Sequence, residues 1–293
     1  MMKKLNNKRI GLLCILLILI PFSLQADFIG MNWGARPMAL GEAYVALADD
    51  PSAVFWNPAG LSYINCYSVL ASHQNLYGIG DLYNEMVTLS IPLKSVRLGL
   101  GWTQINLLDE YSEQVIALSA ASIIWYKNIP IRFGVSLDNY YVSVPGYDNV
   151  ESPYTKLLGI KFPGKFDLDV GIITTPMKNF SIGFTARNLI ERSITLVSES
   201  EKIKRNFALG AHYQWRDVVN FLLDYNWDKD DSSLHFGWEI WFFDVFAPRM
   251  GLNRDYLTIG FGIKAKNWTL DGAVYSHEEL GSTYRLSFGV QFK

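Results

Sequence analysis

The run Leu257-Thr-Ile-Gly-Phe-Gly-Ile-Lys264 alternates strictly between two kinds of side chain. Large apolar side chains occupy every second position, at Leu257, Ile259, Phe261 and Ile263, and small or polar residues stand between them. Because successive side chains of a β-strand point to opposite faces, a period of two places the apolar set on one face. The stretch therefore predicts a strand with one apolar and one polar side.

The same alternation recurs along the rest of the chain. It is clear in residues 268–274 and 284–292 downstream, and in 166–172, 180–187 and 234–242 upstream. Further runs lie at 66–76, 84–93, 95–106, 115–125, 130–144, 203–215, 218–228 and 245–253. Together these runs predict about 14 evenly spaced strands, many of them close to the ~9–11 residues that a membrane-spanning strand needs.

Two all-β architectures fit this pattern, a secreted β-sandwich and a transmembrane β-barrel. The predicted strands are too many and too long for one sandwich, in which strands of about 5–6 residues are the commonest. Their polar face carries many glycines and charges of both signs, which favours a crowded, hydrated lumen over an open surface. A sheet in hydrocarbon must close on itself, because lipid offers no partners to backbone N–H and C=O groups. We therefore predict a closed, antiparallel transmembrane barrel in contact with outer-membrane lipid.

The last predicted strand also indicates the outer membrane of a Gram-negative-type bacterium. Residues 285–292 end on the apolar pair Val290 and Phe292, which approximates the C-terminal insertion signal of outer-membrane barrels. Ser287 stands where glycine is usual, and Lys293 follows the terminal aromatic residue. The barrel assembly machinery is thus a predicted partner, through the strand that ends at Phe292.

The N-terminal residues predict export. Residues 1–26 combine a basic start, an apolar run at 10–22 and a small residue at Ala26, the pattern of a cleaved signal peptide. The apolar run is shorter than the ~20 residues of a spanning helix. After cleavage Cys66 is the single remaining cysteine, so no intrachain disulfide is expected. A formal net charge of −2 argues against a nucleic-acid partner.

Residues 27–65 do not alternate and are predicted to form a plug, or hatch, inside a barrel of residues 66–293. Glycine and proline are frequent in this segment, and the small apolar stretch 41–48 predicts a short helix that ends at Asp49, Asp50 and Pro51. Irregular backbone at membrane depth is tolerated where protein buries it. Eight strands are few enough for side chains to fill the interior, whereas about 14 would leave a passage unless a plug closed it.

Two motifs in this segment point to a family. The first runs Gly34-Ala-Arg-Pro-Met-Ala-Leu-Gly41-Glu-Ala-Tyr-Val-Ala-Leu-Ala-Asp49-Asp50, and the second is Trp56-Asn57-Pro58-Ala59-Gly60-Leu61. With their spacing, they resemble the N-terminal hatch of the FadL family of outer-membrane transporters, and still more that of its PorV/PorQ branch. Shorter similarities to that branch lie at 168–171, 187–189, 209–213, 238–241 and 248–251. The resemblance implies a 14-stranded barrel closed by a hatch.

The resemblance also implies two alternative functions. The first is passive uptake of a hydrophobic small molecule, such as a long-chain fatty acid, that binds near the extracellular side, shifts the hatch and leaves through an opening in the barrel wall. The second is a PorV/PorQ-like subunit of a type IX secretion or surface-attachment system, with secretion-system proteins as partners and no transport. The implied gate comprises Gly34, Arg36, Gly41, Asp49, Asp50, Asn57, Pro58 and Ala59. Turn formation and N–H capping within the plug are the simpler roles for these residues.

Charged residues on the predicted lumenal face are the remaining site candidates. Both signs are present, which favours pairing with one another and with the hatch over an ion-selectivity filter. They are Arg97, Arg132, Asp138, Asp167, Asp169, Arg187, Asp224, Glu239, Arg249, Lys264, Asp271 and Arg285. The four histidines share no metal-ligand spacing and no nucleophile or phosphate-loop motif is present, so no metal, cofactor or enzymatic activity is predicted. A hydrated lumen further predicts that Thr258→Arg disrupts the barrel far less than Ile259→Arg.

Overall fold

The fold is that of a computed structural model of the 293-residue chain. The structure describes residues 33–108, 111–144, 154–157, 160–196, 199–254, 256–277 and 280–292. The predicted signal peptide and the first residues of the predicted hatch lie outside these ranges. No helix in the described ranges is long and apolar enough to cross a membrane.

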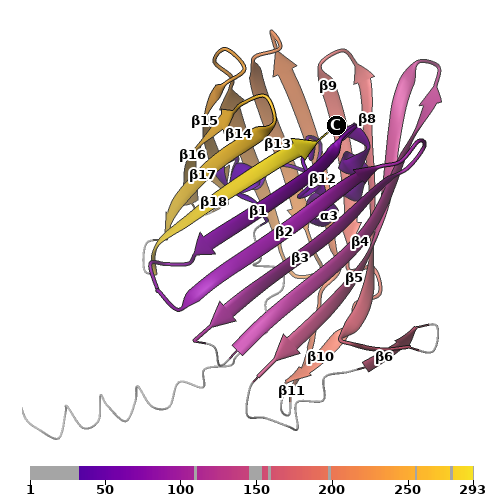
Figure 1. Cartoon of the computed structure of the whole chain (residues 1–293), viewed down its shortest axis with the longest axis vertical. Helices are drawn as coiled ribbons and strands as arrows, with labels where there is room; N and C mark the ends of the chain where they lie inside the picture. Colours follow the sequence, from indigo (N-terminus) through magenta and orange to yellow (C-terminus); the bar gives the residue numbers. More distant parts are fainter. Residues whose placement is uncertain are drawn as a thin grey trace, which may run out of the picture.

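Fourteen strands form one closed antiparallel barrel, as the alternation predicted (Figure 1). Each strand pairs with its neighbours in the chain, and β1 closes the ring on β18 from Tyr67↔Phe292 to Asn75↔Tyr284. The barrel strands are β1 (Tyr67–Asn75), β2 (Leu82–Pro92), β3 (Arg97–Leu107), β4 (Tyr111–Tyr126), β5 (Ile129–Ser143), β8 (Lys165–Met177), β9 (Phe180–Arg187), β12 (Asn206–Trp215), β13 (Val219–Trp227), β14 (Ser232–Ile240), β15 (Phe246–Asn253), β16 (Tyr256–Lys264), β17 (Trp268–His277) and β18 (Gly281–Phe292). Two small hairpins, β6 (Tyr154–Leu157) with β7 (Ile160–Pro163) and β10 (Ser193–Leu196) with β11 (Glu199–Lys202), lie in the two longest connections.

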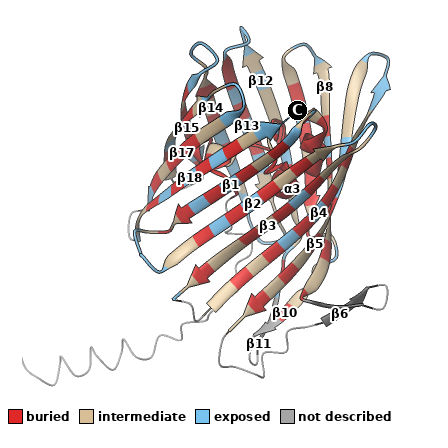
Figure 2. Cartoon of the chain, viewed as in Figure 1, coloured by how far each residue is buried: buried red, intermediate tan, exposed pale blue. Residues whose placement is uncertain are grey.

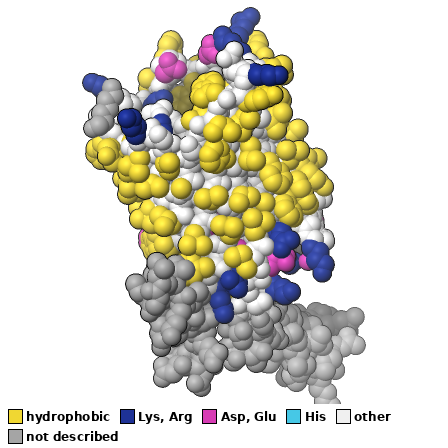
Figure 3. All heavy atoms as spheres, turned by 90° about the vertical axis from the view of Figure 1, so that its right-hand side faces the viewer, with side chains coloured by type: hydrophobic (Ala, Val, Ile, Leu, Met, Phe, Trp, Pro, Cys, Tyr) yellow, Lys and Arg dark blue, Asp and Glu magenta, His cyan; other side chains and the backbone are white. Residues whose placement is uncertain are grey.

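The two faces of the strands follow the predicted alternation. In β16, Leu257 and Ile259 are 53% and 52% exposed, whereas Thr258 between them is 2% exposed. Figure 2 shows the same change from buried to exposed residues along most strands. The outer face carries large apolar side chains over much of its surface, and Figure 3 shows them as a belt between two charged ends. Such a continuous apolar surface is stable against lipid, so the wall is that of an outer-membrane barrel.

The two ends of the barrel differ in the length of their connections. One end carries the short turns 93–96, 127–128, 178–179, 216–218, 241–245 and 265–267, and the C-terminal end of β18 lies beside them (Figure 1). The opposite end carries the connections that contain β6–β7 and β10–β11. Outer-membrane barrels have short periplasmic turns and longer extracellular loops. We therefore assign the short turns to the periplasmic rim and the hairpins to the extracellular rim.

An arginine on the outer face is expected to weaken the barrel. Ile259 lies opposite Met250 of β15 and Val274 of β17, away from both rims. We expect Ile259→Arg to lower the free energy of unfolding in lipid vesicles by ~2–4 kcal/mol, because a cation near the bilayer midplane is poorly solvated. Urea titration of the refolded protein measures the change.

The matched lumenal control for this substitution is Thr269→Arg. Thr269 lines an open cavity inside the barrel, so its arginine would stay hydrated. Equal losses for Ile259→Arg and Thr269→Arg would contradict the assignment of the two faces. Thr258 is not used as the control, because its side chain lies against protein: its Oγ1 accepts from the Gly41 N–H at 3.1 Å and donates to the Ala39 carbonyl at 3.2 Å. That Thr258→Arg costs far less than Ile259→Arg stays a prediction.

Residues 33–64, here called the lumenal segment, lie inside the barrel. The segment contains α2 (Ala35–Ala39), α3 (Ala53–Trp56) and the 3₁₀ helix η2 (Pro58–Tyr63). The helix α2 contacts β15 to β18, and η2 contacts β3, β4, β5 and β8, so the segment reaches opposite sides of the wall. Most of its residues are buried. They form, with lumenal side chains of the wall, the main hydrophobic core of the described protein.

The predicted helix at 41–48 is not formed. The helix α2 ends at Ala39, and Gly41 and Glu42 follow with positive φ angles of 62° and 66°. The next free backbone donors, the N–H groups of Tyr44 and Val45, both bond to Oδ2 of Asp224 on β13, at 2.6 and 2.8 Å. A contact from a distant strand therefore takes the place of the helical hydrogen bonds that local composition favours.

Candidate functional site

The lumenal segment contacts the wall most closely where the wall residue is glycine. An added Cβ would lie 1.9 Å from Asn57 Oδ1 at Gly171, 2.4 Å from the Val45 carbonyl oxygen at Gly183, and 2.0 Å from the Gly41 nitrogen at Gly251. Equally short approaches to the segment occur at Gly99, Gly101, Gly134, Gly237 and Gly260. These inward glycines were predicted to suit a hydrated lumen. They instead let backbone and side-chain atoms of the segment approach the backbone of the sheet.

The Asn57-Pro58-Ala59 motif forms the turn that places η2 against β5 and β8. The Asn57 side chain accepts from the Ala59 N–H at 3.2 Å and donates to the Val45 carbonyl at 2.9 Å, so one amide joins two parts of the segment. Pro58 lies at the start of η2, where a missing N–H costs no helical hydrogen bond. The motif is buried and packs against Gly134 and Gly171.

A second set of predicted residues meets in a buried network of charges. Arg36 of α2 donates hydrogen bonds from Nε and Nη2 to the Glu239 carboxylate of β14, both at 3.0 Å. Its Nη1 lies 2.6 Å from Asp49 Oδ1. Arg249 of β15 contacts Glu239 at 2.6 Å with Nε and Asp271 of β17 at 2.6 Å with Nη1. The chain of charges therefore joins the lumenal segment to three strands of the wall. Each buried charge has an opposite charge beside it, which offsets its loss of hydration.

Neutral groups complete the shell around Glu239. Its Oε1 accepts from Asn220 Nδ2 at 2.8 Å and from Trp241 Nε1 at 2.9 Å, in addition to the arginines. Glu239 is fully buried, and its two oxygens have partners on the segment and on neighbouring strands. The charged members of this network were each predicted from the sequence as separate candidates. Asn220 and Trp241 were not predicted, because the pairing of β13 with β14 and the turn after β14 bring them to the carboxylate.

Two carboxyl groups of the lumenal segment, those of Glu42 and Asp50, have a raised pKa. Burial raises the pKa of Glu42 to about 7, although the positive charges of Arg187 and Arg285 on the wall oppose the rise. Burial also raises the pKa of Asp50, against the attraction of Arg36 and hydrogen bonds from Ser52 and Tyr44. The rise in pKa reflects the loss of hydration of these carboxylates inside the barrel.

On the periplasmic side of the lumenal segment the barrel is hollow. A cavity of about 570 Å³ opens there, with Arg36, Asp49 and Asp50 of the segment on one side. The wall contributes polar and charged side chains on the other sides, among them Arg132, His212, Asp217, Asp244, Arg249, Lys264 and Asp271. The charge network between the segment and the wall therefore borders this cavity. Lys264 reaches it over the ring of Trp241, with Nζ 5.8 Å from the ring centre.

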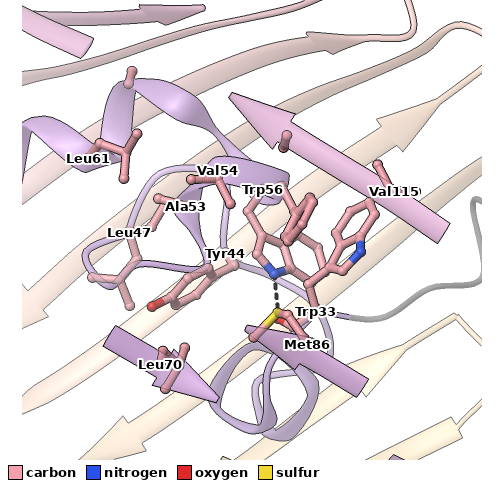
Figure 4. Close-up of a cluster of buried hydrophobic side chains, with 14 of the residues drawn as sticks. Trp33, Tyr44, Leu47, Ala53, Val54, Trp56, Leu61, Leu70, Met86 and Val115 are labelled. Atoms are coloured by element: carbon pink, nitrogen blue, oxygen red, sulfur yellow. Dashed lines mark hydrogen bonds between the residues drawn. The ribbon is translucent and has the colours of Figure 1, made fainter. Parts of the chain in front are cut away.

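On the extracellular side the lumen is filled by an apolar cluster. Trp33 stacks on Phe55 with ring centres 5.3 Å apart, and the Trp56 Nε1–H donates to the Trp33 carbonyl at 2.7 Å (Figure 4). Wall and loop residues extend the cluster, with Val115, Tyr140, Val142, Ile194 and Ile203 among its members. A cavity of about 20 Å³ remains beside Trp33 and Phe55, room for one water molecule. The two tryptophans thus pack the core of the segment.

The other predicted lumenal arginines are distributed around the segment. Arg97 donates to the Ile64 carbonyl at 3.3 Å, Arg132 lies 3.9 Å from the ring centre of Tyr63, and Arg187 lies 5.5 Å from a ring centre of Trp33. Arg285 is fully buried and donates to the side-chain oxygens of Gln74 and Asn84. These four cations hold separate parts of the segment or the wall, and the structure does not gather them into one site.

The predicted acidic residues of β8 fasten the extracellular loop that follows β9. Asp167 Oδ1 accepts from the Ile190 N–H at 2.8 Å, and Asp169 Oδ1 accepts from the Asn188 N–H at 2.7 Å. The loop continues into β10–β11, whose Ile194 packs in the apolar cluster. These two carboxylates therefore have a structural role at the extracellular rim. Asp138, beside them on β5, accepts from the Ser136 hydroxyl at 2.6 Å.

Histidines and metal-binding groups do not form a centre in the described part of the chain. His212 contacts Asn220 Oδ1 at 2.9 Å, and His235 contacts the Gly41 carbonyl at 2.8 Å, so each has a neutral neighbour on a different strand or on the segment. No group of three or more His, Cys, Asp or Glu side chains within the described ranges is placed to hold a metal ion.

Several solved structures have a fold similar to that of this chain. No protein-family model matches the chain, and no curated protein matches its sequence. Among solved structures it resembles a FadL homologue of Pseudomonas aeruginosa, with 13% identity, 89% of this chain and 98% of that chain covered, and a TM-score of 0.61. It also resembles the toluene transporter TodX of P. putida, with 11% identity, 89% and 99% coverage and a TM-score of 0.60. A third similar structure is the toluene transporter TbuX of Ralstonia pickettii, with 11% identity, 89% and 99% coverage and a TM-score of 0.58.

At such low identity the likeness shows a shared fold. The predicted FadL-type barrel is confirmed at that level. Membership of the PorV/PorQ branch stays a prediction, as do the gate residues and the partners in secretion and barrel assembly.

Proposed function

We propose that this protein is an outer-membrane channel for the passive uptake of hydrophobic small molecules, with long-chain fatty acids as the first candidates. The main support is the arrangement of the lumen. The barrel is closed and faces lipid, the lumenal segment lies inside it, and a cavity opens on one side of that segment. Its fold is shared with proteins described as toluene transporters and as a FadL homologue. No covalent chemistry is needed for this role.

The apolar cluster on the extracellular side supports a hydrophobic cargo. Trp33, Phe55, Val115 and Val142 belong to an apolar cluster in the extracellular half of the lumen, which water solvates poorly. A hydrophobic molecule that replaced some of these contacts would meet the same kind of surface. The lumenal segment would then have to shift for the molecule to reach the periplasmic cavity.

One interruption of the wall next to the cavity lies between β14 and β15. The ladder between β14 and β15 covers five residue pairs, from His235↔Asn253 to Glu239↔Arg249, and the adjacent Pro248 has no N–H to continue it. Trp241, just beyond this point, lines the periplasmic cavity. We propose this gap in the ladder as the exit from the cavity to the lipid.

A reversible crosslink between the segment and the wall tests the proposed function. The Ala35 N–H lies 2.8 Å from Ser287 Oγ, so a disulfide between the two cysteines introduced by Ala35→Cys and Ser287→Cys, in a Cys66→Ser background, would tie α2 to β18. We expect oxidised protein in vesicles to pass a fluorescent long-chain fatty acid at the rate of empty vesicles, and the reduced protein to restore uptake. Each single-cysteine variant serves as the control. Uptake that equals that of empty vesicles for the reduced and wild-type proteins would reject the transport function.

The secretion or attachment subunit remains the second candidate, and its support is the sequence of the lumenal segment, which resembles the PorV/PorQ branch at 34–50 and 56–61. This role predicts no fatty-acid uptake in the reduced state. It also predicts that the protein co-purifies from its native membrane with secreted cargo or with other envelope proteins.

A further inference from the structure

The periplasmic rim carries a ring of exposed cations. Five of its six short turns hold one each, and the five residues are Lys94, Lys127, Lys178, Arg216 and Lys266. All five side chains are exposed. Within the described ranges none of them lies within 4.0 Å of a carboxylate, because every ion pair found there involves other cations. We call these five residues the basic rim.

The acidic residues of this rim face inward. Asp217 lies in the turn 216–218 and Asp244 in the turn 241–245, and both residues line the periplasmic cavity. Asp217 Oδ1 is held by Asn179 Nδ2 of the neighbouring turn at 3.2 Å. Charge is therefore sorted at the rim, with carboxylates around the cavity mouth and cations on the outside. The outside of the rim carries five positive charges that the described residues leave without a counter-ion.

The extracellular rim is built differently. Three of its cations pair with carboxylates of the same rim: Lys204 lies 3.1 Å from Asp230, Arg205 lies 3.6 Å from Glu191, and Arg254 pairs with Asp231. None of the five cations of the basic rim has such a pair among the described residues. Figure 3 shows cations at the end with the short turns, above the apolar belt.

Aromatic side chains place the basic rim at the level of lipid headgroups. Tyr126, Trp215 and Trp268 are exposed at positions of the outer face, next to the turns. Lys127 Nζ lies 5.4 Å from the ring centre of Tyr126, and Arg216 Cζ lies 4.7 Å from a ring centre of Trp215. Tryptophan and tyrosine gather at membrane–water interfaces, and long basic side chains extend from there toward the headgroups. The cationic ends are therefore at the depth of lipid phosphates.

We propose that the basic rim binds the phosphates of anionic phospholipids in the periplasmic leaflet, so that the barrel selects a negatively charged lipid shell at this end. A phosphodiester supplies the acceptor oxygens and the negative charge that the five cations lack. The turn 241–245 interrupts the ring, because it exposes Phe242 and Phe243 and carries no cation. The proposal concerns the outer surface of the barrel and holds whether or not the lumen transports a solute.

Fluorescence quenching by brominated lipids tests the proposal. The full mature chain is refolded into phosphatidylcholine vesicles that contain either brominated phosphatidylglycerol or brominated phosphatidylcholine, and the tryptophan quenching gives the relative binding of the two lipids. We expect wild type to favour phosphatidylglycerol by about threefold or more at low salt, and the preference to shrink as salt screens the charges. The variant with Lys94→Gln, Lys127→Gln, Lys178→Gln, Arg216→Gln and Lys266→Gln is expected to lose the preference.

A matched control removes three cations from the opposite rim. Lys204→Gln, Arg205→Gln and Arg254→Gln together should leave the preference for phosphatidylglycerol unchanged. Equal quenching by both lipids in wild type, or a preference that survives in the five-residue variant, would overturn the proposal. Loss of the preference in inorganic phosphate but not in chloride of equal ionic strength would assign the rim to free phosphate instead. If the five-residue variant does not insert, each single substitution must lower the preference.

Discussion

Vesicles that contain a barrel without residues 27–65 are expected to leak small solutes. In this variant residues 1–26, the predicted signal peptide, are joined directly to residue 66, and the wall keeps all of its strand-to-strand hydrogen bonds. What is lost is the segment that fills the middle of the lumen against the inward glycines of the wall. A barrel of this size lies between eight-stranded barrels, which side chains fill, and open porins, so we expect the influx of a small sugar to rise roughly tenfold or more. Liposome swelling measures the rate.

The control for this deletion removes a different segment, the hairpin β10–β11. Deletion of residues 193–202 takes away β10 and β11 at the extracellular rim and leaves the lumenal segment in place. Vesicles with that variant should stay closed to the sugar, because the packing between the segment and the wall is retained. Closed vesicles for the variant without residues 27–65, together with a gel shift on heating that shows a folded barrel, would contradict the plug.

The wall could be predicted from the sequence because each of its positions meets one of two environments. Lipid on one side and packed lumen on the other require the alternation seen in 257–264, and the strand found there is β16 (Tyr256–Lys264). The predicted run at 115–125 corresponds to β4 (Tyr111–Tyr126), the longest strand of the barrel. The residues that precede the predicted run include Ser112, Glu113 and Gln114, whose polar side chains hide the alternation. The inward member, Glu113, is buried, so only the three-dimensional context separates the faces there.

The interior was harder to predict because its contacts join residues far apart in the chain. Asp224 takes the N–H groups of Tyr44 and Val45 from 180 and 179 residues away, and no local pattern announces this. The inward glycines could have been recognised as sites of close approach, since an isolated glycine within a strand often marks one. Which residues of the lumenal segment approach each glycine, however, depends on the path of that segment through the barrel. Among the gate residues, Arg36 and Asp49 belong to the charge network, whereas Asn57 and Pro58 shape the turn before η2.

Glu239→Gln is expected to cause the largest loss of stability of any single substitution in the charge network. The glutamine keeps the size of the side chain but removes the one negative charge that both Arg36 and Arg249 contact. Arg249 retains Asp271 and Arg36 retains Asp49, so each cation loses part of its compensation. Breaking a buried ion pair from one side costs about 3–5 kcal/mol, and we expect a loss in that range by urea titration in detergent or vesicles.

A double-mutant cycle shows whether this loss comes from the contact between the segment and the wall. Arg36→Gln combined with Glu239→Gln removes both members of the contact, so the double variant should be more stable than the sum of the two single losses implies, by about 0.5–3 kcal/mol. Glu191→Gln is the matched control, because Glu191 forms an ion pair of 3.6 Å with Arg205 in which both side chains are well exposed, and its loss should cost no more than about 1 kcal/mol. Additive losses in the cycle would mean that Arg36 and Glu239 act separately. In that case the segment would be held by its packing against the glycines of the wall, and substitution of Gly171 or Gly183 would be the stronger way to release it.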